Sequence, residues 1–456
     1  IIRRASGNSN KKHGCNQAGV IFHGDAFNVF GIFTRMANTI LSILVRMSIL
    51  SRKKEKNRSS RWRASLFYLL VTVWSVSPVI SSEEVPRQFR VWVFGDAHVG
   101  TDIGQGRESL AEAIRQSESG GELGGPPFDW DIAIAVGDFA GGFGVPTDEE
   151  GEELVRQFGV MQHHRREDVY SLAGNHDATL YTEPTQWWFR RWVDPLGENP
   201  LFSGVDPEKR KYQPQGTWER YSFRAGNLLF LIMSDRNDLP PPIGRGRIDA
   251  GNAVGGYPAG AVTGDTFSWW RQTVESNPDA VIISAHHHML KETTTASGEW
   301  EGFTRQSDDT WRPLYHGYHA TGAPRGASYL YFVDGKPDAQ SFEQYLAGSP
   351  QAIDVWLGGH THLNPVRRTG DRRYLERKWG VTFINAAALS RHHNPLTVPP
   401  SSRLLTFTDG SDQLRVQFYL HTRDIHYQGW YADEEITVTL SKPFRMATGD
   451  SDEVDN

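Results

Sequence analysis

The sequence predicts an α/β protein. Helical patterns of apolar residues at 108–116, 149–158, 267–275 and 338–346 lie between short apolar runs. The last two apolar runs, 404–407 and 414–419, follow each other closely and predict a closing antiparallel hairpin. The runs are rich in β-strand formers and end in polar turns with glycine; they cover residues 89–94, 132–136, 169–172, 228–233, 280–284, 355–357, 381–384, 404–407 and 414–419.

The composition is that of a soluble globular protein. Of the 456 residues, 38% are hydrophobic and 22% charged, which excludes collagen-like, coiled-coil and wholly disordered chains and allows a sizeable core. Cys15 is the only cysteine, so an intramolecular disulfide, a Cys-based zinc site and a thiol nucleophile are all excluded. A metal ion would have to be bound by His, Asp, Glu or Asn.

The N-terminal region is predicted to lie outside the globular fold. Residues 1–46 show no globular pattern and are interpreted as a leader. Residues 47–82 resemble an export signal, with a basic run followed by the apolar run 64–80, and predict a secreted or periplasmic protein with only transient membrane contact. The alternative is an uncleaved membrane anchor formed by residues 64–80, because 17 residues are close to the shortest length that spans a bilayer.

Charge is distributed unevenly along the chain. Residues 1–63 hold 13 Lys and Arg against two acidic residues, whereas residues 64–456 hold 35 Lys and Arg against 52 Asp and Glu. An acidic body of this kind binds nucleic acid poorly, so no nucleic-acid partner is expected.

Two segments are predicted to be insertions in a domain that spans residues 86–445. Residues 239–264 are rich in Gly and Pro, and residues 291–326 are polar and aromatic. The second segment is interpreted either as a lid over an organic leaving group or as a packed satellite cluster.

Polar side chains follow five of the apolar runs. Functional residues of open α/β sheets gather at the carboxyl ends of strands, so these side chains are the candidate site. Carboxylate, imidazole and amide oxygen suit a divalent ion such as Zn, Mn or Fe. In chain order the candidates are Asp96 and His98, Asp138, Asn175 with His176 and Asp177, His286, and His360 with His362.

These five blocks resemble the calcineurin-like metallophosphoesterase family. The family pattern runs Asp-x-His, Gly-Asp, Gly-Asn-His-Asp/Glu, a lone His and Gly-His-x-His, and the chain follows it in order over residues 89–420. The resemblance implies a four-layer αββα sandwich and hydrolysis of phosphoric esters. In many members Asp and Arg stand where this chain has Gly141 and Gly142.

The resemblance also implies roles for the individual residues. Two divalent or trivalent ions would share a bridging hydroxide as the nucleophile, and His176, with Asp177 as its expected partner, would act as general acid. The implied ligands are Asp96, His98 and His362 for one ion, Asn175, His286 and His360 for the other, and Asp138 for both.

The neighbouring histidines receive a different interpretation. Strand alternation would turn His287 and His288 away from the site if His286 faces it, so both are expected behind the site or on the surface. His392 and His393 are interpreted either as part of the substrate side or as solvated loop residues.

Two further alternatives remain open at this stage. One is a non-catalytic metal-containing binding module. The other is a lipid-directed, sphingomyelinase-like phosphodiesterase. The choice between a phosphomonoester and a phosphodiester substrate is also open.

Overall fold

In the computed structural model, all the described residues belong to one compact unit, Val85–Asn456. The predicted leader and export signal lie outside the described residues, as do His392 and His393. The structure describes residues 86–141, 145–177, 187–236, 260–298, 303–305, 307–308, 311–313, 329–334, 336–362, 364–366, 373–391 and 398–447.

One large sheet is built mainly from the two ends of the domain. Its order is β18-β17-β16-β1-β2-β3, with β19 paired to β17. β1, β2 and β3 are parallel, and β16 pairs antiparallel with both β1 and β17. The predicted closing hairpin is therefore confirmed. The strands are β1 (Gln88–Phe94), β2 (Ile132–Ala135), β3 (Val169–Ser171), β16 (Ser401–Thr408), β17 (Gln413–Leu420), β18 (Gly429–Trp430) and β19 (Ile436–Thr439).

The middle of the chain forms the second large sheet, in the order β14-β15-β13-β8-β6-β5-β4. Its centre is parallel, since β8 pairs parallel with both β6 and β13, and β13 pairs parallel with β15. The strands are β4 (Gln215–Gly216), β5 (Arg220–Ala225), β6 (Leu228–Met233), β8 (Val281–Ala285), β13 (Val355–Gly358), β14 (Leu375–Lys378) and β15 (Val381–Asn385).

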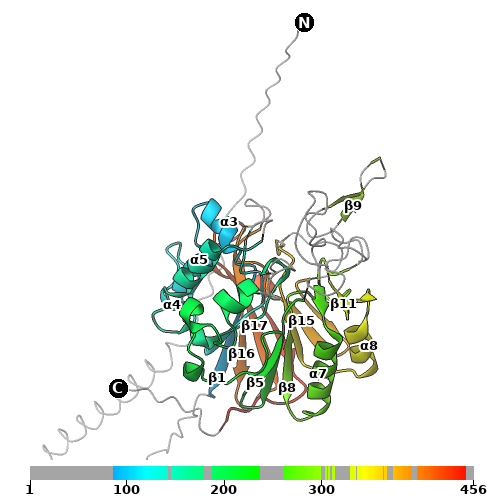
Figure 1. Ribbon diagram of the computed structural model, residues 1–456. Coiled ribbons are helices and arrows are strands. Elements are labelled where there is room, and N and C mark those ends of the chain that lie inside the picture. Colours follow the sequence, from blue (N-terminus) through cyan, green and yellow to red (C-terminus); the bar gives the residue numbers. More distant parts are fainter. Residues whose placement is uncertain are drawn as a thin grey trace, which may run out of the picture. The chain divides into compact units, whose positions relative to one another are not determined.

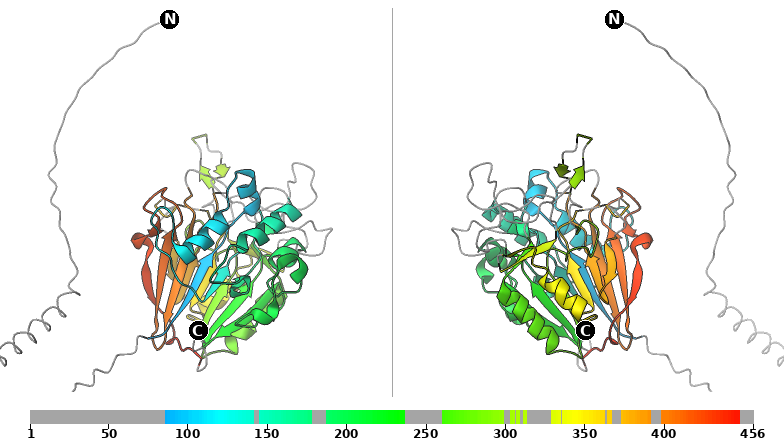
Figure 2. Two further views of the ribbon diagram at one scale, coloured as in Figure 1. Left: turned by 90° about the vertical axis from the view of Figure 1, so that its left-hand side faces the viewer. Right: turned by 90° about the vertical axis from the view of Figure 1, so that its right-hand side faces the viewer.

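Helices lie outside both sheets (Figure 1). α3, α4 and α5 lie on one side of the sheet pair and α7 and α8 on the other, and the side views in Figure 2 show the same layering. The α-helices are α3 (Val99–Gly104), α4 (Ser109–Ser119), α5 (Asp148–Phe158), α6 (Pro200–Ser203), α7 (Gly264–Glu275) and α8 (Ser341–Gly348). Shorter helical turns are η2 (Arg166–Asp168), η3 (Asn175–Asp177), η4 (Phe189–Val193), η5 (Pro207–Lys209) and η7 (Ala432–Glu434).

The core follows from the two-residue period of the strands. Val91 and Val93 face a core between the sheets, whereas Trp92 and Phe94 pack under the helices on the other side of β1. In the second sheet Ile283 faces the same inter-sheet core, and Ile282 packs with Trp270 of α7. Three apolar layers between four structural layers confirm the predicted αββα sandwich.

The predicted insertions contain short strands. β7 (Gly260–Val262) pairs with β11 (Leu330–Val333), which also pairs with β12 (Lys336–Pro337). β9 (Phe303–Arg305) and β10 (Trp311–Pro313) form a separate hairpin. The rest of both insertions lies largely outside the described residues. Among the residues that the structure describes, no helix is both long and apolar enough to cross a membrane.

Candidate metal centre

The carboxyl ends of β1, β2, β3, β8 and β13 meet at one edge of the sandwich. Parallel pairing within each sheet brings these ends together. Backbone hydrogen bonds fasten the first two loops to each other, because Asp96 N–H donates to the Gly137 carbonyl over 2.9 Å and His98 N–H to the Asp138 carbonyl over 3.1 Å.

The backbone is strained at several of the candidate ligands. Asp96, His98, Asp138 and His360 have φ of 55°, 42°, 56° and 69°, in the left-handed region that side chains other than glycine rarely adopt. Such strain costs of order 1–3 kcal/mol per residue and is concentrated at functional sites. The left-handed backbone conformation directs these side chains toward the candidate site.

Four of the predicted ligands form a fully buried group, called here the central cluster: Asp96, His98, Asp138 and His362. His362 Nε2 lies 2.7 Å from Asp96 Oδ1 and 3.2 Å from His98 Nε2. His98 Nδ1 lies 3.0 Å from the Ala140 carbonyl oxygen, so this nitrogen carries the proton and donates to it. The Nε2 lone pair of His98 therefore points into the cluster, which is the form in which imidazole binds a metal.

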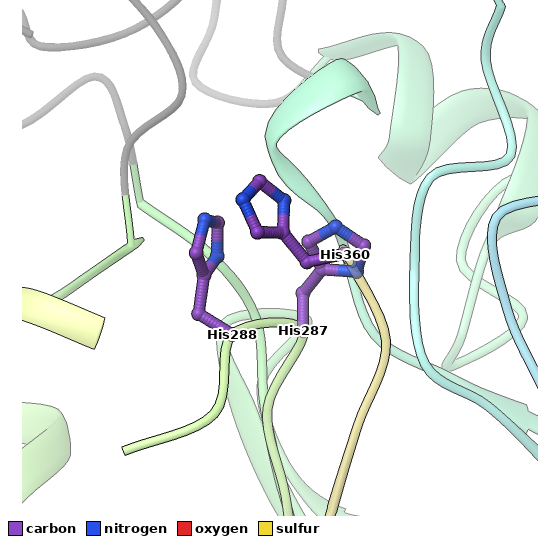
Figure 3. Close-up of side chains that lie close together, drawn as sticks. All are labelled: His287, His288 and His360. Carbon is purple, nitrogen blue, oxygen red and sulfur yellow. The ribbon is translucent and has the colours of Figure 1, made fainter. Parts of the chain in front are cut away.

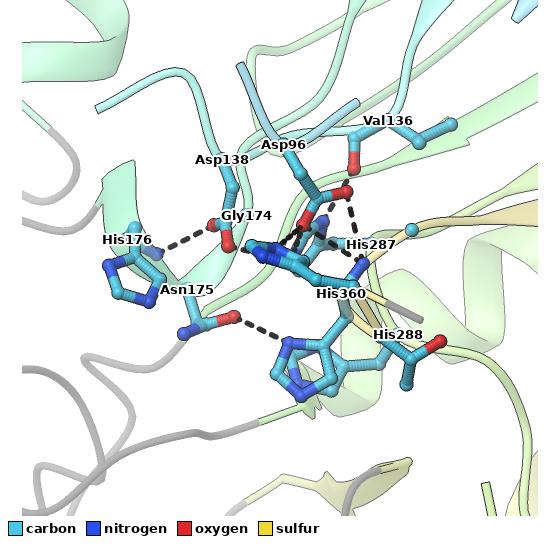
Figure 4. Close-up of polar contacts among 12 residues, drawn as sticks. Asp96, Val136, Asp138, Gly174, Asn175, His176, His287, His288 and His360 are labelled. Atoms are coloured by element: carbon cyan, nitrogen blue, oxygen red, sulfur yellow. Dashed lines mark hydrogen bonds and ion pairs between the residues drawn. The ribbon is translucent and has the colours of Figure 1, made fainter. Parts of the chain in front are cut away.

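A second set of donor atoms lies beside Asp138. Asn175 Oδ1 and His360 Nδ1 are 3.0 Å apart, and His287 Nε2 lies 3.0 Å from Asp138 Oδ2 (Figure 4). His287 Nδ1 lies 2.6 Å from the Val136 carbonyl oxygen, so its Nε2 also presents a lone pair. Asp138 Oδ2 is thus between this second set and His98, whose Nε2 is 3.8 Å away.

The structure does not bring His286 to Asn175 and His360. Val281, Ile283 and Ala285 face the inter-sheet core, and the same alternation continues past the end of β8, so His287 faces Asp138 and His286 the opposite side. Pairing with β13 also continues, since Gly359 N–H donates to the His287 carbonyl over 2.8 Å. Both His287 and His288 are completely buried, so the surface alternative for them is wrong, and His287, 3.0 Å from Asp138 Oδ2, takes the position expected for His286.

His286 belongs instead to a group that we call the outer cluster: Asp235, His286 and His288. The sequence interpretation missed Asp235, although it follows the buried run of β6 in the same way that Asp96 follows β1. His288 is close to the second donor set as well, because its ring centroid lies 3.8 Å from that of His360 (Figure 3).

His176 lies beside the central cluster. Its backbone N–H donates to Asp138 Oδ1 over 2.8 Å, and its ring meets the His98 ring edge-on at 4.8 Å between centroids. The side chain is only 1% exposed. His176 therefore both positions Asp138 and borders the central cluster.

The contacts of Asp177 differ from its expected role as partner of the His176 ring. Its carboxylate accepts hydrogen bonds of 2.8–2.9 Å from four backbone N–H groups, those of Asp138, Phe139, Ala140 and Gly174. Asp177 thus holds the loop that carries Asp138. Burial and the nearby charge of Asp138 raise the pKa of Asp177 to about 7.

The electrostatics of the centre favour a positive charge. Burial raises the pKa of Asp138, but the charges of His287 and His176 outweigh it and hold the pKa well below its usual range. Burial lowers the pKa of His287, yet the Asp138 carboxylate outweighs this and raises it to about 10, so a second proton lies on Nε2 unless a cation beside Asp138 takes its place. The negative charge comes from two buried carboxylates, Asp96 and Asp138. Among the described residues, their ion pairs are all with histidines.

Glycines let the loops approach closely. A Cβ on Gly174 would collide with Asp138 Oδ1, and one on Gly359 would lie 2.5 Å from Asp96 Oδ2. A Cβ on Gly141 would collide with the backbone of Thr101, so the Asp found here in many family members has no room. Gly142 lies outside the described residues.

One further positioning residue was missed in the sequence. Asn385, the last residue of β15, donates through Nδ2 to the Gly359 carbonyl over 2.9 Å and to Thr361 Oγ1 over 2.7 Å. It holds the loop that carries His360 and His362. The only signal in the sequence for this role of Asn385 was its position at the end of a predicted strand.

The residues present fit divalent metal ions. Imidazole lone pairs and carboxylate oxygens converge at 2.7–3.2 Å in a buried space, with the protons of His98 and His287 committed to backbone carbonyls. Donor atoms arranged in this way repel one another unless a proton or a cation lies between them. The fold and this centre together define a metal-dependent α/β hydrolase.

Comparison with known proteins supplies the family. The profile of the calcineurin-like phosphoesterases matches residues 89–364, and the chain belongs to this family, whose members are phosphoesterases that typically use divalent metals. The predicted family is thereby confirmed, and the class of enzyme is metallophosphoesterase. No curated protein matches the chain by sequence.

Several solved structures match the chain at low identity. A Streptococcus pneumoniae protein described as a conserved uncharacterized protein and predicted phosphoesterase is 9% identical over 77% of this chain and 98% of its own, with a TM-score of 0.29. GAP50, the anchor in the inner membrane complex of Plasmodium, is 9% identical over 78% and 90%, with a TM-score of 0.40. Vacuolar protein sorting 29 from Cryptosporidium parvum is 12% identical over 78% and 99%, with a TM-score of 0.26.

Proposed function

We propose that the chain hydrolyses phosphoric esters at a dinuclear metal centre bridged by Asp138. One ion would be held by the central cluster, and the other by Asp138, Asn175, His287 and His360. The observation that carries the proposal is the position of Asp138 Oδ2, 3.0 Å from His287 Nε2 and 3.8 Å from His98 Nε2. A shared carboxylate offsets the repulsion of two cations about 3.5–4 Å apart.

The bound cations would supply Lewis acidity, which activates water as the nucleophile and neutralises charge on the phosphoryl oxygens. The chain's own residues supply position and a proton. His98 and His287 are fixed in the ligand form by backbone carbonyls, and Asp177 and Asn385 hold the two loops that carry the ligands. His176 would donate a proton to the leaving oxygen.

Replacement of His176 tests this function. His176→Ala should leave the metal content intact and lower turnover of p-nitrophenyl phosphate or its bis ester by about 10²- to 10⁴-fold, the usual contribution of a positioned acid. The variant keeps the backbone N–H that donates to Asp138. Metal analysis and steady-state kinetics on the same preparation give both values. Unchanged turnover would exclude the proposed role of His176.

The same substrates decide between the classes of ester. The absence of the Arg that stands at Gly142 in many family members favours a substrate with fewer free phosphate charges, hence a diester. Hydrolysis of the monoester alone would reverse this choice, and hydrolysis of sphingomyelin vesicles would identify a lipid-directed enzyme. A chain that binds metals and hydrolyses none of these would be a binding module.

We also propose that the chain is exported. The support is the basic run followed by the apolar residues 64–80. N-terminal sequencing of the protein from its producing cells, in the medium or periplasm and in the membrane fraction, distinguishes a cleaved signal from an anchor.

A further inference from the structure

The outer cluster is formed by the face of the second sheet that the helices cover. Leu231 and Met233 of β6 face this side, and Asp235 continues their alternation. His286 and His288 continue the alternation of Ile282 in the same way. All three side chains of the outer cluster have an exposed fraction of 0%, and none belongs to the proposed dinuclear centre.

Three possible ligand atoms converge there. His288 Nδ1 lies 3.1 Å from Asp235 Oδ2, and His286 Nε2 lies 3.9 Å from the same oxygen. All three atoms are within 4.8 Å of one another. Ligands about 2.0–2.2 Å from a tetrahedral ion are about 3.3–3.5 Å apart, so a small adjustment would fit one cation among these atoms.

Hydrogen bonding does not account for this convergence. Although His288 Nδ1 is close to Asp235 Oδ2, no hydrogen bond forms between them, and His288 Nε2 makes none with the residues that the structure describes. The Ala261 N–H, at 3.3 Å, donates to Asp235 Oδ2. Close nitrogen and oxygen atoms with no proton directed between them are the pattern expected around a bound cation.

The protonation of His286 is compatible with a ligand role. Its Nδ1 is 3.3 Å from the His288 carbonyl oxygen and 3.0 Å from the His288 amide nitrogen. The His288 N–H donates to Nδ1, which places the ring proton on Nε2; a cation bound beside Asp235 would shift this proton to Nδ1, where the His288 carbonyl oxygen can accept it. A backbone carbonyl that accepts from the distal ring nitrogen is the common arrangement around metal-binding histidines.

We propose that Asp235, His286 and His288 bind a third divalent cation beside the dinuclear centre. Two imidazoles and one carboxylate match a zinc-type site and leave a fourth position for water or substrate. The two sites would be neighbours, since the His288 ring packs on the His360 ring with 3.8 Å between centroids.

Metal counting on the full chain tests the proposal. The protein is stripped with a chelator, reloaded with Zn²⁺, desalted and measured by mass spectrometry of the metal and by protein quantitation. The native chain should hold three ions, and Asp235→Asn, which keeps the shape of the side chain, should hold two. The matched control is Asp354→Asn: Asp354 is a buried aspartate of the same sheet whose Oδ2 accepts from Ile282 N–H over 2.9 Å, and its replacement should leave three ions.

The difference between the native chain and Asp235→Asn decides the outcome. A difference of one ion supports the outer site, whereas no difference, or the loss of every ion from a folded variant, overturns it. The number of ions that remains in the variant tests the dinuclear centre separately: two supports that centre and none refutes it. If circular dichroism shows that Asp235→Asn is unfolded, His286→Gln gives the same comparison.

Discussion

The central and outer clusters use the same residue types at the same edge of the sandwich, yet only one of them has a sequence motif. The central cluster comes from Asp-x-His and Gly-His-x-His, whose spacing identifies it directly. The outer cluster joins Asp235 after β6 to His286 and His288, two positions apart after β8, and no sequence spacing links Asp235 to these histidines. Parallel strands bring ligands together by topology, so metal-competent groups form without a motif.

The largest effect should come from the residue that the two proposed ions share. Asp138→Asn removes the bridging charge and should lower turnover by about 10³-fold or more, since losing an ion costs several kcal/mol of charge stabilisation. The metal count should fall as well. Kinetics and metal analysis measure both, and a variant with full turnover would show that Asp138 does not bridge.

The two adjacent histidines distinguish the clusters from each other. His287→Ala removes a ligand of the dinuclear centre and should lower turnover by more than about 100-fold, above the usual cost of losing an outer partner of a ligand. His286→Ala changes the outer cluster and should lower turnover by less than about 10-fold. Side-by-side kinetics test this order, and the reverse order would contradict the assignment of faces after β8.

A smaller loss of turnover is expected from crowding the contact between the loops that carry Gly174 and Asp138. Gly174→Ala puts a methyl group against Asp138 Oδ1 and should lower stability by about 1–3 kcal/mol and turnover by about 10²-fold, because ligands displaced by about 1 Å react poorly. Gly348→Ala is the matched control: the last residue of α8 has open space around its Cα. Thermal unfolding should show Gly348→Ala at or above the stability of the native chain; equal losses in both variants would refute the crowding argument.

A buried carboxyl outside both clusters should affect only stability. Burial raises the pKa of Glu343 in α8 to about 7, and its Oε2 makes no hydrogen bond with any residue that the structure describes. Because this pKa lies above the ordinary value of 4.5, the folded state loses stability as the pH rises from 4.5 through 7. Between pH 5 and pH 8 the native chain should lose up to about 3 kcal/mol relative to Glu343→Gln, measured by denaturant unfolding. Turnover should not change, and equal pH dependence in both proteins would contradict the protonated state.

The sequence predicted the layers of the fold and named the four residues that the structure brings together in the central cluster. Strand-end positions located Asp96, Asp138 and His360 because a polar residue directly after a buried strand has few other places to point. The assignment of His286 as the inward-facing histidine differs from the structure for a physical reason. Ala285 already faces the inter-sheet core, so the alternation of side chains places His287 on that side. Asp235 and Asn385 were missed because contacts between distant loops, which give them their roles, leave no local signal.

The proposed centre takes its side chains from both sheets. Asp96, His98, Asp138 and Asn175 follow strands of the first sheet, and His287, His360 and His362 follow strands of the second. Bound ions would therefore cross-link the two sheets of the sandwich. Chelation should loosen the contact between the sheets as well as abolish chemistry, so the resistance of the protein to heat would report how completely it is loaded.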